Sequence, residues 1–277
     1  MSGESAVLRF DDVSLYFGDT PALVHVSFEM GAGETRVVLG ASGSGKTMLL
    51  KTALGLVKPD SGRIYLFGQD ISGLKESDLF DIRSKVGVLF QEGGLFDSMT
   101  IGENVAYPLL NQRALYKDRR QPANGNVEER VREALRFVEL EQTLDKVPSE
   151  LSGGMRRRVG IARAVVTEPP LVLYDSPTAG LDPITAHTII ALLIKERDVS
   201  QATTLVVTQR YQDGNLIANF RYNSEQGSLE PNRGGVQRDL RTTFMVLKEG
   251  RLIFEGVQDE LEASKDSYIC KFVKPRV

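Results

Sequence analysis

Eight consecutive residues form a complete match to a phosphate loop, the pattern G-x-x-x-x-G-K-[ST]. The loop consists of Gly40, Ala41, Ser42, Gly43, Ser44, Gly45, Lys46 and Thr47. Its glycines let the backbone curl so that successive N–H groups point at a triphosphate, and the helix expected next adds the positive end of its dipole. We expect Lys46 to neutralise the β- and γ-phosphates and the Thr47 hydroxyl to bind Mg²⁺. These residues therefore predict a site for ATP or GTP.

A second motif with anion-binding chemistry lies further along the chain. It reads Leu151, Ser152, Gly153, Gly154 and Met155, and a helix that begins with three arginines is expected to follow. The serine supplies a hydroxyl, the glycine pair allows close backbone approach, and a helix N-terminus attracts negative charge. The alternative is an ordinary serine helix cap with a flexible glycine pair. The phosphate loop upstream favours the first interpretation.

With both motifs in this order, the chain resembles the nucleotide-binding subunits of ABC transporters. In that family the second motif is the signature, which binds the γ-phosphate of the ATP held by the opposite subunit. The resemblance implies that residues 171–175 form the Walker B strand, where Asp175 holds Mg²⁺ at the carboxyl edge of a parallel sheet. Residues 176–183, which include Asp182, are similar to the family's D-loop, and we include Asp182 among the candidate catalytic residues.

Two further residues match positions of the same family. Gln91 follows a predicted strand and matches the Q-loop glutamine, which touches Mg²⁺ and relays contact with the membrane partner. Phe17 precedes Gly18 where an aromatic residue stacks on adenine, with Tyr16 as the alternative. Either ring could instead belong to the core.

The motifs follow the family's order along nearly the whole chain. The resemblance implies an α/β fold, a P-loop (RecA-like) ABC ATPase core with an antiparallel β subdomain and an inserted α-helical subdomain. We expect one ABC ATP-binding domain over residues 1–277. Within it we expect a helical subdomain at about 92–158, a polar surface insertion at about 210–243 and a short C-terminal extension at about 258–277.

Residue patterns indicate the elements that position these motifs. Alternation over residues 7–10 and 24–30 predicts an antiparallel strand pair before the phosphate-loop strand. Apolar residues at helical spacing predict an amphipathic helix over 127–140. The other predicted elements are helices over 47–56 and 75–84 and strands over 36–39, 63–67, 85–90, 171–174 and 204–207. Residues 222–235 are dense in turn formers and predict a loop.

Two positions depart from the family's catalytic pattern. Ser176 stands where the family has the glutamate that activates the attacking water, and a neutral hydroxyl cannot take that proton near neutral pH. Gln209 stands where the family has a histidine that contacts the γ-phosphate, and glutamine carries no charge. A general base typically contributes about 10²- to 10⁴-fold in rate. We therefore expect tight nucleotide binding with weak hydrolysis.

The resemblance implies a motor subunit that closes with a second nucleotide-binding subunit on two ATPs and so moves an integral membrane permease. Whether that dimer is a homodimer or a heterodimer with an intact subunit stays open. The alternative is an ATP-gated regulatory or binding module with little turnover. Soluble ABC proteins of DNA repair or translation fit poorly, because the chain has neither a long coiled-coil insertion nor a tandem cassette.

A narrower resemblance concerns residues 89–100 and 104–109, together with Met155 at the end of the signature. These segments are similar to the ATPases of Mla/Mce-type phospholipid transporters, which pair with a permease and a lipid-binding MCE protein. The matching segment is expected to form the permease-facing surface. The resemblance thus implies a lipid-handling system.

Composition limits the remaining classes. The chain has 277 residues, 41% of them hydrophobic and 26% charged, which is ordinary for a globular protein. Its net charge of −3 argues against a nucleic-acid partner, although residues 156–158 form a basic cluster. No apolar run approaches the ~18 residues of a membrane span, no secretory signal is visible, and a single cysteine, Cys270, fits a reducing compartment. We expect a cytoplasmic protein, peripheral on the cytoplasmic face of the inner membrane.

Overall fold

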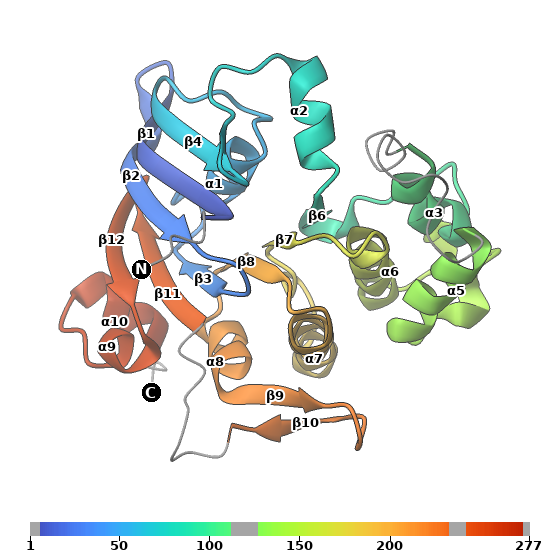
Figure 1. Cartoon of the computed structure of the whole chain (residues 1–277). Coiled ribbons are helices and arrows are strands. Elements are labelled where there is room, and N and C mark those ends of the chain that lie inside the picture. Colours follow the sequence, from blue (N-terminus) through green and yellow to red (C-terminus); the bar gives the residue numbers. More distant parts are fainter. Residues whose placement is uncertain (1–5, 112–126, 233–241, 274–277) are drawn as a thin grey trace.

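The computed structural model describes residues 6–111, 127–232 and 242–273, with a six-stranded sheet at its centre (Figure 1). The strand order is β12 (Arg251–Gly256), β11 (Thr242–Lys248), β3 (Thr35–Leu39), β8 (Thr203–Thr208), β7 (Leu171–Asp175) and β6 (Val86–Leu89). Strands β11, β3, β8, β7 and β6 run parallel, and β12 pairs antiparallel with β11. Every residue of β3, β7 and β8 is buried, which explains why their sequences do not alternate.

A four-stranded antiparallel sheet shares a hydrophobic core with the central sheet. Its order is β2 (Thr20–Met30), β1 (Leu8–Phe17), β4 (Ser61–Leu66) and β5 (Gln69–Asp70). Phe10 and Phe28 stack across β1 and β2 with their ring centroids 4.8 Å apart. Helix α1 (Lys46–Ala53) joins this core through Leu49 and Leu50, both almost fully buried. The predicted antiparallel strand pair is confirmed and belongs to this larger sheet.

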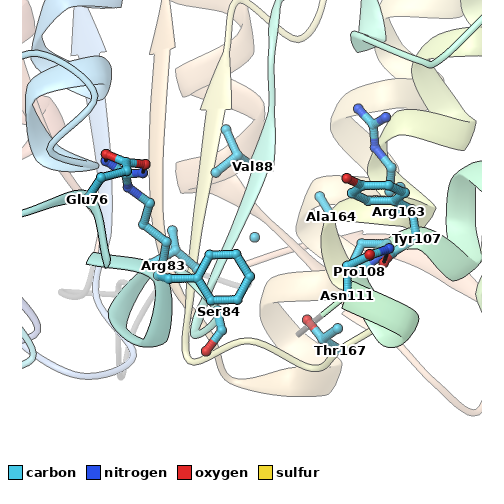
Figure 2. A pocket seen from close by; sticks show the side chains of 13 residues that line it. Glu76, Arg83, Ser84, Val88, Tyr107, Pro108, Asn111, Arg163, Ala164 and Thr167 are labelled. Carbon is cyan, nitrogen blue, oxygen red and sulfur yellow. Dashed lines mark hydrogen bonds and ion pairs between the residues drawn. The ribbon is translucent and has the colours of Figure 1, made fainter. Parts of the chain in front are cut away.

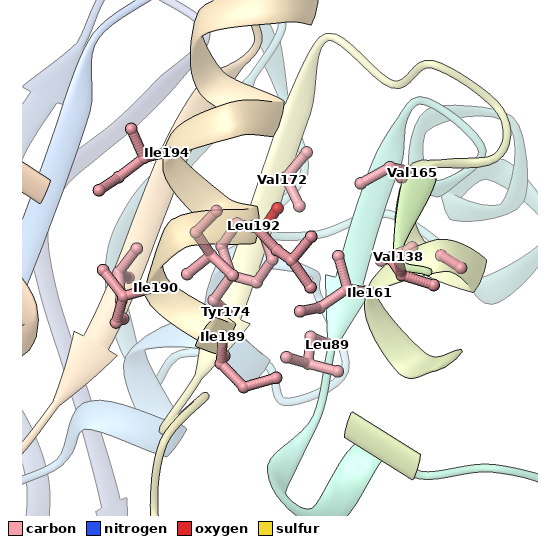
Figure 3. Packing of buried hydrophobic residues seen from close by; sticks show 14 of the residues in the cluster. Leu89, Val138, Ile161, Val165, Val172, Tyr174, Ile189, Ile190, Leu192 and Ile194 are labelled. Atoms are coloured by element: carbon pink, nitrogen blue, oxygen red, sulfur yellow. The ribbon is translucent and has the colours of Figure 1, made fainter. Parts of the chain in front are cut away.

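Helices form a second core on the other side of the central sheet. They are α3 (Ile101–Asn111), α5 (Val127–Phe137), α6 (Gly153–Val165), α7 (Pro183–Ser200) and α8 (Tyr211–Asn219). Tyr174 of β7 belongs to the same buried cluster as Ile161 of α6 and Leu192 of α7 (Figure 3). Helices α3 and α5 pack on α6, away from the antiparallel sheet (Figure 1). The α/β fold with an inserted helical region is therefore confirmed, while the boundaries at 92 and 158 stay predictions.

The remaining elements are short. They are α2 (Glu76–Arg83), the 3₁₀ helices η1 (Gln91–Gly93), η2 (Glu141–Thr143) and η3 (Pro148–Glu150), and the C-terminal helices α9 (Gln258–Glu262) and α10 (Ser267–Val273). Among the described residues, none of these or the longer helices combines the length and apolar character that crossing a bilayer requires.

The segment predicted as a loop over 222–235 contains a hairpin, so that prediction is wrong for its described part. Strands β9 (Phe220–Asn223) and β10 (Ser228–Pro231) pair antiparallel. The turn formers make only the connection, where Gly227 has a φ of 66°. The Tyr222 N–H donates to Asp198 Oδ2 of α7 at 2.7 Å, which attaches the hairpin to the helix. Residues 233–235 lie outside the described part of the chain.

The polar surface insertion over about 210–243 stays a prediction, although its residues 211–219 are helical rather than a surface loop. These residues form α8, and Tyr211 and Ile217 are only 9% and 2% exposed. Both belong to the helical core. The sequence hides this because α8 is short and five of its nine residues are polar or glycine: Gln212, Asp213, Gly214, Asn215 and Asn219.

Candidate nucleotide site at the carboxyl edge of the parallel sheet

Strand register brings most of the predicted site residues to one edge of the central sheet. Leu39 of β3 pairs with Thr208 of β8, and Asp175 of β7 pairs with Val207. Leu89 of β6 pairs with Tyr174. The residues that leave these four strand ends are the phosphate loop, Gln209, Ser176 and Gln91. Parallel strands thus gather segments that lie far apart in sequence, as expected for the carboxyl edge of such a sheet.

Two glycines of the phosphate loop are required by close backbone contacts. A Cβ on Gly40 would lie 2.6 Å from the Leu247 carbonyl oxygen, and a Cβ on Gly45 would lie 2.4 Å from the Ala22 carbonyl oxygen. Gly45 also has a φ of 105°, which disfavours any side chain. Helix α1 begins directly after Gly45, so its free N–H groups face the loop. This cradle fits a triphosphate.

Lys46 lies inside the loop. Its ammonium donates to the carbonyl oxygens of Gly40 at 2.8 Å and Ala41 at 2.7 Å. Only 6% of the residue is exposed. Burial lowers the pKa of Lys46 to about 8, and the nearby Asp175 carboxylate opposes that change. A cation is therefore held where phosphate charge is predicted to lie.

Asp175 ends β7 and is 3% exposed. The Ser176 hydroxyl donates to Asp175 Oδ1 at 3.1 Å, and the Ser176 backbone has a left-handed φ of 49°. The donors predicted for Mg²⁺ are the Thr47 hydroxyl, the Asp175 carboxylate and the Gln91 amide oxygen, all hard oxygen ligands. The described residues contain no group of three or more His, Cys, Asp or Glu side chains that could hold a metal ion. Mg²⁺ needs no such cluster where phosphates complete its coordination, so these residues fit the ion.

Gln91, Gln209 and the two candidate aromatic residues are exposed. Phe17 is 54% exposed at the end of β1, and Tyr16 is 41% exposed. The alternative that either ring fills the core is therefore wrong. Stacking on adenine stays a prediction.

The helix predicted after the signature is α6, but it begins at Gly153, within the signature, and not at the three arginines. The Met155 N–H donates to Ser152 Oγ at 3.2 Å, so Ser152 is a helix cap. A Cβ on Gly154 would lie 2.5 Å from Thr185 Cγ2 of α7, which places the signature beside the start of that helix. Within the described residues no hydrogen bond joins residues 151–155 to the loop at 40–47.

The three arginines after the signature bind the protein's own backbone. Arg156 donates to the Leu151 carbonyl oxygen at 2.6 Å, and Arg158 donates to that of Val138 at 3.2 Å. Arg157 is 4% exposed and donates to the Ser176 carbonyl oxygen at 2.8 Å. A nucleic-acid role is not needed to explain this basic cluster.

Asp182 caps helix α7. Its Oδ1 accepts hydrogen bonds from the N–H groups of Ile184 and Thr185, both at 3.0 Å. A hydrogen bond from the Thr185 side chain, together with these backbone bonds, lowers the pKa of Asp182, since they favour the charged carboxylate. The structure thus gives Asp182 a capping role, and a catalytic role stays a prediction.

Sequence reasoning missed two residues that support the site. Asp213 of α8 is 1% exposed and contacts the segments that contain Ser176 and Gln209. Tyr268 of α10 accepts a hydrogen bond from the Ala41 N–H at 2.9 Å and donates to the Leu247 carbonyl oxygen at 3.1 Å. No local pattern could reveal either contact, because each joins residues that are close only in the folded chain.

Comparisons with known proteins agree with this geometry. The profile of the ABC transporter family matches residues 23–179. The chain is 38% identical over 192 residues to the probable ribonucleotide transport ATP-binding protein Mkl of Mycobacterium leprae, which covers 69% of this chain and 53% of that relative. It is 30% identical over 257 residues to the intermembrane phospholipid transport system ATP-binding protein MlaF of Haemophilus influenzae, which covers 93% of this chain and 86% of that relative.

A solved structure shows the same fold. It is a dimeric ATP-binding cassette in a post-hydrolysis state, bound to ADP and Pi, and it superposes with a TM-score of 0.72. The sequences are 29% identical, and the match covers 90% of this chain and 98% of that one. The matched part of this chain covers 53% of the Mkl relative, so the chain spans about half the length of that protein.

Proposed function

The chain belongs to the ABC transporter family, and from that premise we propose that it is the ATP-binding subunit of a transporter, closing as a dimer on ATP to drive a membrane permease. The observation that carries this proposal is the strand register. It brings the phosphate loop, Asp175, Gln91 and Gln209 to one edge of a parallel sheet. A Gly-rich turn with another purpose would need none of these neighbours.

ATP binding rests on residues with complementary chemistry. The loop N–H groups and Lys46 face the phosphates, and Phe17 or Tyr16 offers an exposed ring for adenine. Thr47, Asp175 and Gln91 would hold Mg²⁺, which neutralises phosphate charge when bound. The exposed Ser152 and Gly153 of the signature would reach the ATP held by the second subunit. A homodimer and a heterodimer both satisfy this arrangement.

Intrinsic hydrolysis is expected to be weak. The Ser176 hydroxyl donates to Asp175, and neither group is placed to take a proton from water as a free base. Gln209 is exposed at the end of β8 and carries no charge to stabilise the γ-phosphate. Loss of a general base alone costs about 10²- to 10⁴-fold in rate.

A groove between α2, β6, α3 and α6 fits a permease. The groove has a volume of about 390 Å³, and Tyr107 lies along it (Figure 2). Phe80 and Tyr107 are the large exposed side chains of its lining. Arg163 lines the groove and donates to the carbonyl oxygens of Gly93 and Gly94, just after Gln91. We assign the groove to a short helix of the permease, whose docking would act on Gln91 through these carbonyls.

The transported substrate is proposed to be a lipid. The match to MlaF extends over 93% of this chain, whereas the match to Mkl covers 69%. A lipid-handling system of Mla/Mce type would add an MCE protein as a partner and would place this subunit on the cytoplasmic face of the membrane. A competing proposal for the transported substrate is a ribonucleotide, because the name of the Mkl relative gives ribonucleotide transport.

A second candidate function is favoured by Ser176 and Gln209. A regulatory module would close on ATP and hold or release its partner with little turnover. This function predicts an ATP-bound dimer that lasts for minutes. Rapid dissociation in Mg²⁺ and ATP, followed by light scattering, would argue against it.

The main test compares the wild-type chain with the double variant Ser176→Glu and Gln209→His. Because φ at residue 176 is 49° for serine already, glutamate meets a similar backbone cost. We expect similar ATP affinity in both and a gain in hydrolysis of about 10²-fold or more in the double variant. The matched control adds Asp175→Asn to the double variant and should remove that gain. Brisk hydrolysis by the wild type, or no gain in a double variant that binds ATP, would refute the proposal of weak turnover at these positions.

A further inference from the structure

A buried carboxylate joins two segments of the site. Asp213 Oδ2 accepts hydrogen bonds from Thr178 Oγ1 at 2.5 Å and from Thr208 Oγ1 at 2.8 Å. Arg210 Nε lies 3.5 Å from the other carboxylate oxygen. Thr178, Thr208 and Asp213 are each at most 2% exposed, so water does not compete for these bonds.

The two threonines belong to the segments that contain the altered catalytic positions. Thr178 lies two residues after Ser176, in the turn that leads to Asp182. Thr208 is the last residue of β8 and precedes Gln209. One oxygen atom therefore connects the turn after β7 to the end of β8. From the other side, Arg157 donates to the carbonyl oxygens of Ser176 and Ala179, which leaves this turn few ways to move.

The direction of the Thr208 hydrogen bond is fixed by a neighbouring backbone group. Thr208 Oγ1 accepts from the Arg210 N–H at 3.0 Å, so its only proton is free to point at Asp213. Both threonine hydroxyls donate to the same oxygen, which favours the ionised carboxylate. Burial raises the pKa of Asp213, and these two bonds oppose that rise. Charge-assisted bonds of this kind are about twice as strong as neutral ones.

The turn held by Thr178 ends at an exposed surface beside the signature. Ile184, at the start of α7, is 82% exposed, although it is large and apolar. Thr185 next to it contacts Gly154 of the signature. If the signature faces the ATP of a second subunit, this surface faces that subunit too.

We propose that Asp213 is a positioning residue that makes the turn over residues 176–182 and the Gln209 end of β8 move as one body. A γ-phosphate that contacts Gln209 would then shift the surface around Ile184, and the second subunit would in turn shift Gln209. This inference rests on the proposed function, because it needs ATP-dependent dimerisation. Asp213 itself touches neither nucleotide nor partner.

The test uses threonine variants that keep side-chain shape. Thr178→Val removes one bond to Asp213, Thr178→Ser keeps it, and Thr143→Val is a matched control. Thr143 is fully buried and donates one hydrogen bond, to the Leu140 carbonyl oxygen at 2.7 Å, away from the site. Two quantities are measured for each full-length variant. They are the affinity for a fluorescent ATP analogue, and the ATP-induced fraction of dimer by analytical ultracentrifugation.

We expect Thr178→Val to weaken ATP-induced dimerisation about tenfold, within the usual range of coupling between sites. Its ATP affinity as a monomer should change by less than about twofold, because the phosphate loop is untouched. Thr178→Ser should restore dimerisation, and Thr143→Val should lower the melting temperature only. Adding Asp213→Asn to Thr178→Val should cost dimerisation little more, since loss of the Thr178 bond alone already breaks the link between the two segments. If Asp213→Asn does not fold, Thr208→Val replaces it in this cycle.

Equal dimerisation by Thr178→Val and Thr143→Val would overturn the inference. So would additive losses in the double variant, or a parallel loss of ATP affinity, which would indicate a purely structural role. A wild-type chain that binds no ATP, or that binds it without dimerising, would instead overturn the proposed function and the inference with it. The wild-type measurement thus separates the two failures.

Discussion

ATP binding by this chain should weaken as the pH rises above 8. The perturbation is deprotonation of Lys46, whose pKa burial lowers to about 8 in the free protein. Bound phosphates would favour the charged ammonium and return its pKa toward the ordinary value of 10.5. Between these two pKa values, the binding of ATP must therefore be accompanied by uptake of a proton at Lys46. Below pH 7 the lysine is charged in both states, so no dependence on Lys46 is expected there.

The size of the effect follows from the fraction of free protein that has lost the proton. Deprotonation multiplies the apparent Kd by a factor equal to one plus the ratio of neutral to charged Lys46. This factor is about 1.3 at pH 7.5 and about 11 at pH 9. Affinity should therefore fall about eightfold over that range. The nucleotide itself contributes little to this pH dependence, because the last proton of its phosphates has a pKa of about 6.

The assay is titration with a fluorescent ATP analogue at constant ionic strength from pH 7.5 to pH 9. Isothermal titration calorimetry in two buffers of different ionisation enthalpy, at pH 8.5, should report uptake of about 0.8 proton per ATP. Lys46→Arg is the matched control, because arginine stays charged across this range. Its affinity at pH 7.5 is expected to be lower, but its pH dependence should vanish.

A flat wild-type profile between pH 7.5 and pH 9 would refute the reasoning. The same slope in Lys46→Arg as in wild type would also refute it, because another group would then be titrating. Either result would mean that the buried position of Lys46 does not govern how the loop takes up phosphate.

Two further predictions concern stability. Burial raises the pKa of Glu196 from 4.5, so the stability that its proton provides is present below pH 4.5 and is lost as the pH rises through the folded-state pKa. Glu196→Gln should therefore raise the free energy of unfolding by on the order of 1 kcal/mol at pH 7 and have no such benefit at pH 4, as urea titrations at both values would show. Equal gains at both pH values would contradict this. The Tyr174 hydroxyl is buried and has no hydrogen-bond partner among the described residues. Tyr174→Phe should raise the free energy of unfolding by up to about 1 kcal/mol, and a loss of that size in guanidinium denaturation would show that the hydroxyl has a partner.

Local motifs made much of the site predictable. The sequence of the phosphate loop carries its own conformation, because Gly43 and Gly45 adopt positive φ that other residues avoid. Strand β7 ends at Asp175, as its sequence indicated, whereas α6 starts at Gly153, three residues before the predicted arginine start. Helix α1 ends at Ala53 rather than at residue 56, since Gly55 reverses the chain with a φ of 64°.

The features that sequence reasoning missed depend on contacts between distant residues. The hairpin of β9 and β10 is too short and polar for its alternation to stand out, and α7 supplies the surface that holds it. Asp213 resembles any acidic residue in a polar helix until folding brings Thr178 beside it. Ser176 and Gln209 were visible as departures from a pattern, but the bond that links their segments was not.

The Tyr268 hydroxyl gives the end of the chain a direct contact with the loop that should receive phosphate. The sole cysteine, Cys270, stands two positions further along the same helix and is half-buried with a free thiol. An environment-sensitive dye attached to that sulfur would sit close enough to register any shift of α10 when ATP enters. Spectroscopists would thus obtain an optical signal from a single native attachment point, without engineering a new one.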